Sequence, residues 1–116
     1  MANEFPHVKQ FHFFKIITIQ SLLVGKLMIP RKFVEKYRNC LPNAIYLKTP
    51  SGAKWKLDLV KIDGKIWFQK GWKQFAKYHN LAQYHLLIFK YERTSHFHVH
   101  IFEKSANRDK IPFPNS

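Results

Sequence analysis

The sequence has little cysteine, little glycine and few acidic side chains, and it has no long apolar run. Cys40 is the only cysteine among 116 residues, so no disulfide can form within the chain, and a reducing compartment is the simplest expectation. No apolar stretch approaches the roughly 20 residues that span a bilayer. The first residues also lack the charged start and apolar core of a secretory signal. We therefore expect no membrane partner.

The patterns that most enzymes and metal sites require are also missing. The seven acidic residues form no close pair for acid–base or metal-assisted chemistry, and no glycine-rich phosphate loop is present. Cys40, beside the expected end of a helix, is interpreted as a packing residue. His96, His98 and His100 share one face of a strand, but we expect no carboxylate near that face.

These absences predict a non-enzymatic protein with no catalytic residue, no bound metal, no cofactor and no small-molecule substrate. The remaining enzymatic alternative is a metal-dependent nuclease that uses His98 and His100. Nicking of a plasmid in the presence of divalent metal ions would support that alternative.

Positive charge is what the sequence has in excess. Twenty lysine and arginine residues against seven acidic residues give a net charge of +13 and a pI near 10.0. A composition that is 46% hydrophobic and 16% aromatic argues for a folded chain, and a folded domain carries this much charge at the cost of self-repulsion. Polyanions, above all nucleic acids, are the commonest reason for such a charge. The alternative is a basic protein with no polyanionic partner.

The length fits a single domain that we expect to be monomeric, with residues 1–9 as a flexible arm and residues 10–116 as the folded unit. Alternating or continuous apolar runs predict strands at 11–18, 26–30, 44–48, 53–62, 65–69, 84–92 and 96–102. Apolar spacing predicts one helix from Pro30 to about residue 38 and another over 71–79. Many strands with two short helices favour a mainly β fold, a closed or nearly closed antiparallel barrel.

A tight hairpin is predicted at Asp63-Gly64, because a two-residue turn needs positive φ at both positions. The predicted register pairs Ile62 with Lys65, Lys61 with Ile66, Val60 with Trp67, and Leu59 with Phe68. Lys61, Asp63 and Lys65 should then project beyond the barrel. A two-stranded ribbon can enter a DNA major groove, where lysine donates to guanine and aspartate accepts from cytosine. The alternative is a solvated tip whose charges discourage aggregation.

A second polar stretch lies between the first two expected strands. It contains Lys15, Thr18, Gln20, Ser21 and Lys26, and we expect it to form a turn. Glutamine and serine can contact base edges or phosphates, and lysine can neutralise phosphate. The alternative is an ordinary polar loop. Two basic, polar arms on one barrel could grip a single groove together.

Several stretches in this order resemble the plant-specific B3 DNA-binding domain, and most closely its reproductive-meristem class. They read "FFKIIT", "GKLMIPRKFVEKY", "IWFQKGWKQF", "LLIFKYE" and "FHVHIFEKS", and the resemblance extends from about Phe13 to Pro114. It implies a seven-stranded open β-barrel (a pseudobarrel) with two short α-helices. It also implies binding of double-stranded DNA in the major groove, by a plant transcriptional regulator in the nucleus.

The resemblance further implies two DNA-binding arms, one after the first strand and one before the "GW" helix. On this chain they are residues 15–26 and 60–67, the stretches already identified from their own residues. The predicted DNA contacts are Lys15, Thr18, Gln20, Ser21, Lys26, Lys61, Asp63, Lys65, Trp67 and Lys70. Lysine acts as a point charge where arginine forks onto guanine, so these lysine-rich arms predict relaxed sequence specificity.

One departure from the family pattern is Gln83-Tyr84, where many relatives carry Gly-Asp; we expect it to alter a turn and not the DNA-binding face. Two other functions stay open. One is binding of single-stranded nucleic acid, with tyrosines and tryptophans as stacking platforms. The other is a protein-interaction module for an acidic partner, in which DNA binding is vestigial.

Overall fold

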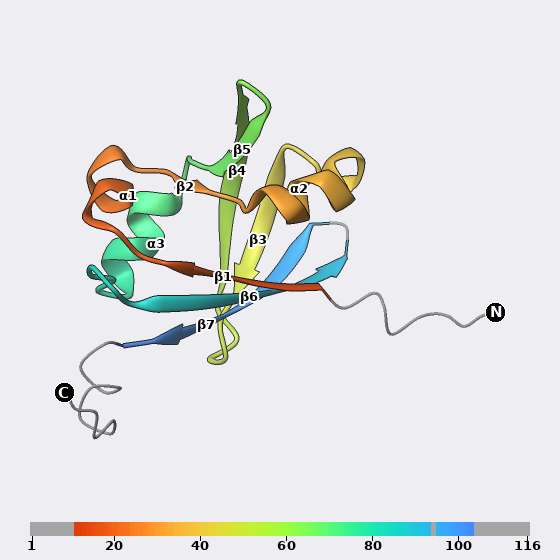
Figure 1. Ribbon diagram of the computed structural model, residues 1–116. Coiled ribbons are helices and arrows are strands. Elements are labelled where there is room, and N and C mark those ends of the chain that lie inside the picture. Colours follow the sequence, from red (N-terminus) through yellow and green to blue (C-terminus); the bar gives the residue numbers. More distant parts are fainter. Residues whose placement is uncertain (1–10, 94, 104–116) are drawn as a thin grey trace, which may run out of the picture.

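Strands dominate the structure, a computed structural model that describes residues 11–93 and 95–103 (Figure 1). The predicted arm over residues 1–9 lies outside the described residues. The elements in chain order are β1 (Phe11–Ile16), α1 (Ile19–Val24), β2 (Leu27–Met28), α2 (Arg31–Tyr37), the 3-10 helix η3 (Arg38–Cys40), β3 (Ala44–Lys48), β4 (Lys54–Ile62), β5 (Lys65–Phe68), α3 (Trp72–Tyr78), β6 (Leu86–Arg93) and β7 (His96–Phe102).

The strands form one curled sheet in the order β1-β6-β7-β3-β4-β5-β2. Its two edge strands, β1 and β2, do not pair with each other, so the seven-stranded open barrel is confirmed and full closure is not. The expectation of a purely antiparallel sheet is wrong, because β3 and β7 run parallel. A strand with one buried face shows the same alternation beside either kind of neighbour, so the sequence pattern could not distinguish them.

The β4–β5 hairpin has the predicted register at all four pairs, from Leu59 opposite Phe68 to Ile62 opposite Lys65. Asp63 and Gly64 have φ values of 51° and 80°, as a two-residue turn with two positive φ angles requires. The hairpin tip extends beyond the body of the sheet (Figure 1). The turn before β6 contains Tyr84 with a φ of 76°. This conformation is unusual for a tyrosine.

Both predicted helices are present, as α2 and α3, but the described residues contain a third α-helix besides η3. The unexpected one is α1, in a stretch predicted as a polar turn. Thr18 caps its start, because the Thr18 Oγ1 accepts a hydrogen bond from the Ser21 N–H at 3.1 Å. Gly25 ends it with a φ of 82°, and the Gly25 N–H donates to the Ser21 carbonyl.

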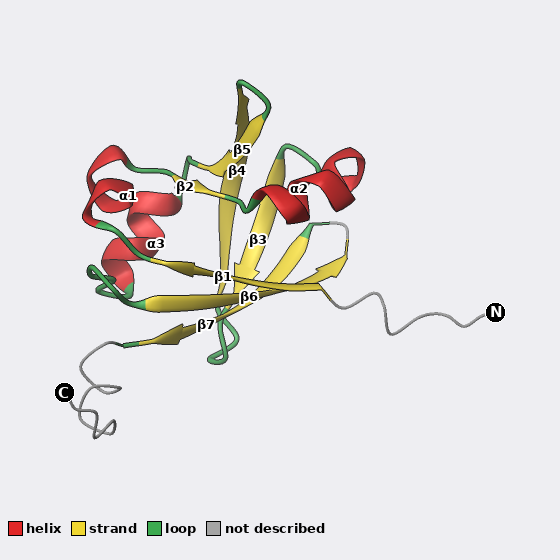
Figure 2. Ribbon diagram, in the orientation of Figure 1, coloured by secondary structure: helices red, strands yellow, loops and turns green. Residues whose placement is uncertain are grey.

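The helices cover the two ends of the curled sheet: α1 and α3 lie together at one end and α2 lies at the other (Figure 2). The indole Nε1 of the buried Trp72 in α3 donates to the Ser21 carbonyl of α1 at 3.2 Å. This hydrogen bond joins residues far apart in the sequence. It therefore ties the first arm to the body of the protein.

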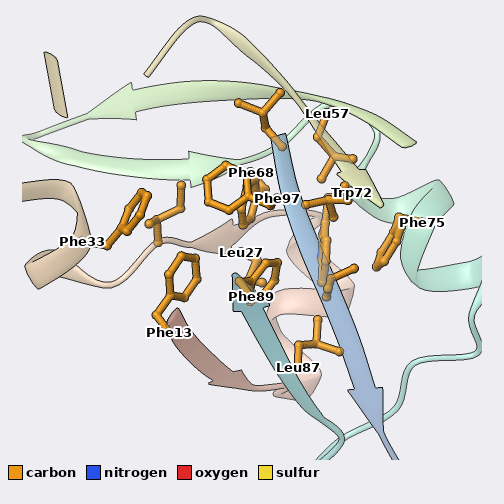
Figure 3. Close-up of a cluster of buried hydrophobic side chains, with 14 of the residues drawn as sticks. Phe13, Leu27, Phe33, Leu57, Phe68, Trp72, Phe75, Leu87, Phe89 and Phe97 are labelled. Atoms are coloured by element: carbon orange, nitrogen blue, oxygen red, sulfur yellow. The ribbon is translucent and has the colours of Figure 1, made fainter. Parts of the chain in front are cut away.

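An aromatic core fills the concave side of the sheet (Figure 3). Phe13 of β1 stacks on Phe89 of β6 with ring centroids 4.8 Å apart, and Phe33 of α2 packs against both Phe13 and Phe97. In α3, Trp72, Phe75 and Ala76 are buried. Cys40, in contrast, is exposed in η3, so its interpretation as a packing residue is wrong. The packed core provides a rigid body on which the arms are mounted.

Candidate nucleic-acid interface

The first arm leaves the sheet at Ile17, whose side chain is fully buried and whose N–H donates to the His85 carbonyl at 2.8 Å. The chain then enters α1 through the Thr18 cap. Ser21 is buried and its hydroxyl donates to the Thr18 carbonyl at 2.9 Å. The structure therefore gives Ser21 a role inside the helix, and the predicted Ser21 contact with DNA finds no support in it.

A hollow of about 420 Å³ gathers six of the ten predicted DNA-contacting residues. Its lining includes Lys15, Thr18, Gln20, Ser21 and Lys26 from the first arm, and Trp67 from β5. The Nζ of Lys26 lies 4.6 Å from the centroid of the Trp67 ring, within the range of a cation–π contact. The strand pairing of β2 with β5 produces this contact, since Met28 lies opposite Trp67.

Lys15 is half-buried in the wall of this hollow. Burial lowers the pKa of Lys15 from its ordinary value of 10.5, because desolvation disfavours the ammonium form. The ion pairs of the described residues are Arg31–Glu35 and His98–Glu92, and neither includes Lys15. An anion that entered the hollow would restore the preference for the charged form.

The second arm carries Lys61, Asp63 and Lys65 as exposed side chains at the hairpin tip. Asp63 and Lys65 line a second hollow, of about 460 Å³, together with residues of β2 and the start of α2. Met28 lines both hollows, so they adjoin across β2. In the view of Figure 1 the hairpin tip and α1 lie in the upper half of the molecule, and the β3–β4 turn lies at the bottom. The two arms therefore border one continuous face, which we call the arm face.

The lysines of the arm face are available to an external anion. In residues 11–93 and 95–103, the ion pairs join Arg31 to Glu35 at 3.8 Å and His98 to Glu92 at 2.6 Å. Neither pair uses a lysine of the two arms. Positive charge that is not neutralised within the protein attracts polyanions and accelerates their association.

Lys70 does not belong to the arm face. It lines a separate hollow between β4 and the start of α3, with Trp55, Lys56, Asp58 and Gln74 among its neighbours. The chain has returned along β5 from the hairpin tip to the body of the sheet before it reaches Lys70. The structure therefore separates Lys70 from the arm face, although Lys65 and Trp67 stand close to it in the sequence.

Arg31 lies on the arm face and was not predicted from the sequence. It lines the second hollow beside Asp63 and Lys65, and its side chain is 84% exposed. The Arg31–Glu35 pair is long and exposed, so it holds the guanidinium weakly. A forked guanidinium can contact a phosphate or a guanine edge. In the sequence, Arg31 follows Pro30 at the start of a predicted helix. That position indicates a helix start but does not indicate a DNA contact.

The three histidines of β7 share one face, as predicted, while Phe97 and Val99 are buried on the other. The expectation of no nearby carboxylate is wrong, because the Oε2 of Glu92 lies 2.6 Å from the Nε2 of His98. An irregularity in the β6–β7 register between Tyr91 and Arg93 accompanies this approach. Within the described residues no three potential metal ligands form a group.

Among the described residues, no helix is long and apolar enough to cross a membrane.

Comparison with known proteins gives a family match and several relatives. The family model for the B3 DNA binding domain matches residues 13–105. The B3 domain-containing transcription factor VRN1 of Arabidopsis thaliana is 41% identical over 93 residues, which cover 80% of this chain and 27% of that protein. The chain spans between 27% and 57% of the length of the first curated relatives that it matches.

Solved structures share the fold. A hypothetical Arabidopsis thaliana protein superposes with a TM-score of 0.72 and 29% sequence identity, covering 80% of this chain and 90% of that one. The Arabidopsis FUS3–DNA complex gives a TM-score of 0.61 at 12% identity, covering 78% of this chain and 95% of that one. At this low identity the second likeness supports the fold alone.

Proposed function

The chain belongs to the B3 DNA-binding domain family, with relatives in its reproductive-meristem-like group, and from this premise we propose that it binds double-stranded DNA through the arm face. The β4–β5 hairpin enters the major groove and α1 lies against the same groove. The domain acts as a monomer within a plant transcriptional regulator in the nucleus. The family is one of DNA-binding transcription factors and is not enzymatic.

The observation that carries the proposal is the shared face of two arms far apart in the sequence. Lys15 and Lys26 border the first hollow, while Arg31 and Lys65 border the second. Cations on both sides of β2 can neutralise phosphates on the two walls of one groove. Phosphate contacts of this kind set the position and orientation of a protein on the duplex, and residues between them can reach base edges.

Single-stranded nucleic acid is less well supported as the ligand. Stacking requires exposed rings, but Trp72 is fully buried and Trp55 packs against Phe75 and Tyr78. Tyr78 and Tyr84 are exposed, but neither lines a hollow of the arm face. Trp67 is the one tryptophan that lines the arm face, and the Lys26 ammonium lies over its ring. Competition between a duplex and its separated strands at equal salt distinguishes the two ligands.

The other alternative is an interaction module for an acidic protein partner. If this alternative is correct, the chain should bind a duplex only weakly at about 0.15 M salt, where charges are screened beyond about 8 Å.

The proposal is tested by titrating the protein with a short duplex and following backbone amide chemical shifts. We expect shift changes in residues 15–26 and 60–67 and at Arg31, and none in the β3–β4 turn. If about six phosphates are neutralised, log K should fall with log salt at a slope near −5. Changes centred on the β3–β4 turn, or a salt slope near zero, would contradict the proposal.

Lys15 predicts a pH dependence of binding. Burial lowers the pKa of Lys15 in the free protein, and a neighbouring phosphate would raise it again by favouring the ammonium. Binding then takes up a proton at alkaline pH. Duplex affinity should therefore fall as the pH rises through the lowered pKa, by up to about tenfold per pH unit.

The measurement is duplex affinity from neutral to alkaline pH at constant salt. Lys15→Arg is the matched control, because arginine stays charged over this pH range. The duplex affinity of this variant should therefore begin to fall only at a higher pH than that of the wild-type protein. Identical pH profiles for the two proteins would remove Lys15 from the phosphate contacts.

A further inference from the structure

Helix α1 presents two different rows of side chains outside the core. Ser21 is buried and Leu22 is half-buried. Gln20 and Val24, one turn apart, line the first hollow, whereas Ile19 and Leu23 form the neighbouring row and do not line it. One row of the helix therefore contributes an amide side chain, Gln20, and an aliphatic side chain, Val24, to the lining of the hollow.

The first hollow is more apolar than a site for phosphate alone requires. Val24 is 52% exposed and Ile16, which also lines the hollow, is 50% exposed. Covering the exposed apolar surface of these side chains with a ligand would remove it from water and contribute favourable free energy. They stand among Lys15 and Lys26, so a ligand that complements the whole hollow combines negative charge with an apolar group.

The major-groove edge of an A·T base pair has this combination. Adenine presents the N7 acceptor and the N6 amino donor, which a glutamine amide can contact together, and thymine presents its C5-methyl group beside them. A G·C pair has no methyl group and offers two acceptors on guanine with a donor on cytosine. Phosphates on either side of the base pair supply the negative charge.

We propose that the first arm recognises A·T base pairs. The Gln20 side chain hydrogen-bonds to adenine N6 and N7, and Val24 with Ile16 covers the thymine methyl group, while Lys15 and Lys26 hold the flanking phosphates. This inference rests on the proposed duplex binding and adds base preference to it. The lysine-rich second arm still contributes affinity with little base preference.

The local structure holds the backbone of α1 in place beneath Gln20 and Val24. The helix is capped by Thr18 at its start and by Gly25 at its end, and Trp72 anchors its middle through the Ser21 carbonyl. A Cβ at Gly25 would lie 3.2 Å from the side chain of Lys73, so α1 also lies close to α3 at its end. A helix backbone that is fixed in this way need not be ordered on binding, which lowers the entropic cost of the contact.

The test uses three duplexes of equal length and therefore equal phosphate charge. One is A·T-rich, the second has every thymine replaced by deoxyuridine, and the third has its A·T pairs replaced by G·C. The wild-type protein should bind the first about tenfold more tightly than the third. It should bind the deoxyuridine duplex about fourfold less tightly for each covered methyl group.

Three variants assign the preference to side chains. Val24→Ala should remove the difference between the thymine and deoxyuridine duplexes, and Gln20→Ala should reduce the preference for A·T over G·C. Leu23→Ala is the matched control: Leu23 is 72% exposed on the same helix but does not line the hollow, so both ratios should stay at their wild-type values. All three substitutions favour the helix, and circular dichroism checks that the fold persists.

The outcomes separate this inference from the proposed function. Equal affinity of the wild-type protein for all three duplexes, with a steep salt dependence, would overturn the A·T preference and leave duplex binding intact. Loss of the methyl effect in Leu23→Ala but not in Val24→Ala would also overturn it. Absence of binding to any duplex would overturn the proposed function itself.

Discussion

Replacing both Lys61 and Lys65 with alanine is expected to weaken duplex binding about 30-fold at 0.15 M salt. Each neutralised phosphate contributes about 0.9 to the slope of log K against log salt, which corresponds to roughly fivefold in affinity at this salt concentration. Both side chains are exposed at the hairpin tip, and neither belongs to an ion pair of the described residues. Their removal should also lower the magnitude of the salt slope by about 2. Titrations at several salt concentrations measure both quantities.

The matched control removes the same amount of charge elsewhere. Lys54 begins β4 beside the β3–β4 turn and Lys77 is exposed on α3, and neither lines the two hollows of the arm face. The Lys54→Ala/Lys77→Ala variant has the same net charge as the hairpin variant. We expect it to bind the duplex within about twofold of wild type, because charges beyond a Debye length are largely screened. Equal losses in both variants would mean that net charge alone, and not the hairpin, determines binding.

Replacing Gly71 with alanine is expected to lower the free energy of unfolding by about 3 kcal/mol. Gly71 precedes α3 with a φ of 96°, and a Cβ at this position would lie 2.5 Å from the carbonyl oxygen of Lys56. That neighbour is backbone of β4, so it cannot rotate away as a side chain would. The clash would push apart β4 and the start of α3, where Trp72 enters the core. Urea denaturation measures the loss.

Gly52 provides the control for the backbone conformation. It has nearly the same φ, 95°, but nothing lies within 4 Å of a Cβ added there. Gly52→Ala should therefore cost only the conformational penalty of about 1 kcal/mol. Similar losses for the two variants would show that the close approach of Gly71 to β4 does not contribute to stability.

The β4–β5 hairpin illustrates how much of the fold could be predicted from the sequence. Asp63-Gly64 specifies a turn type, the turn type fixes the register, and the register decides which face each side chain occupies. The structure has this register. α1 was missed because a six-residue helix with apolar side chains on its exposed face lacks the amphipathic pattern of longer helices. Its caps, Thr18 and Gly25, were the signal that could have revealed it.

Part of the candidate site was also predictable. Both arms were identified from clusters of polar and basic residues, and six of the predicted residues meet in the first hollow. Lys70 was included because it is close to the second arm in the sequence, but it lies in a separate hollow. Arg31 was omitted because it is distant from the second arm in the sequence, but it lies on the arm face. Glu92 likewise reaches His98 from the neighbouring strand, which no spacing within β7 could indicate.

The sequence by itself determined the strands, the hairpin with its register, the excess of positive charge and the family to which the chain belongs. These properties follow from neighbours within a few residues or from composition. The tertiary structure alone decided that β3 runs parallel to β7, that β2 brings the two arms together, and that Gln20 and Val24 share a hollow with Trp67. The reason is physical: burial of the aromatic core selects among many possible long-range strand pairings, and local patterns are compatible with several of them.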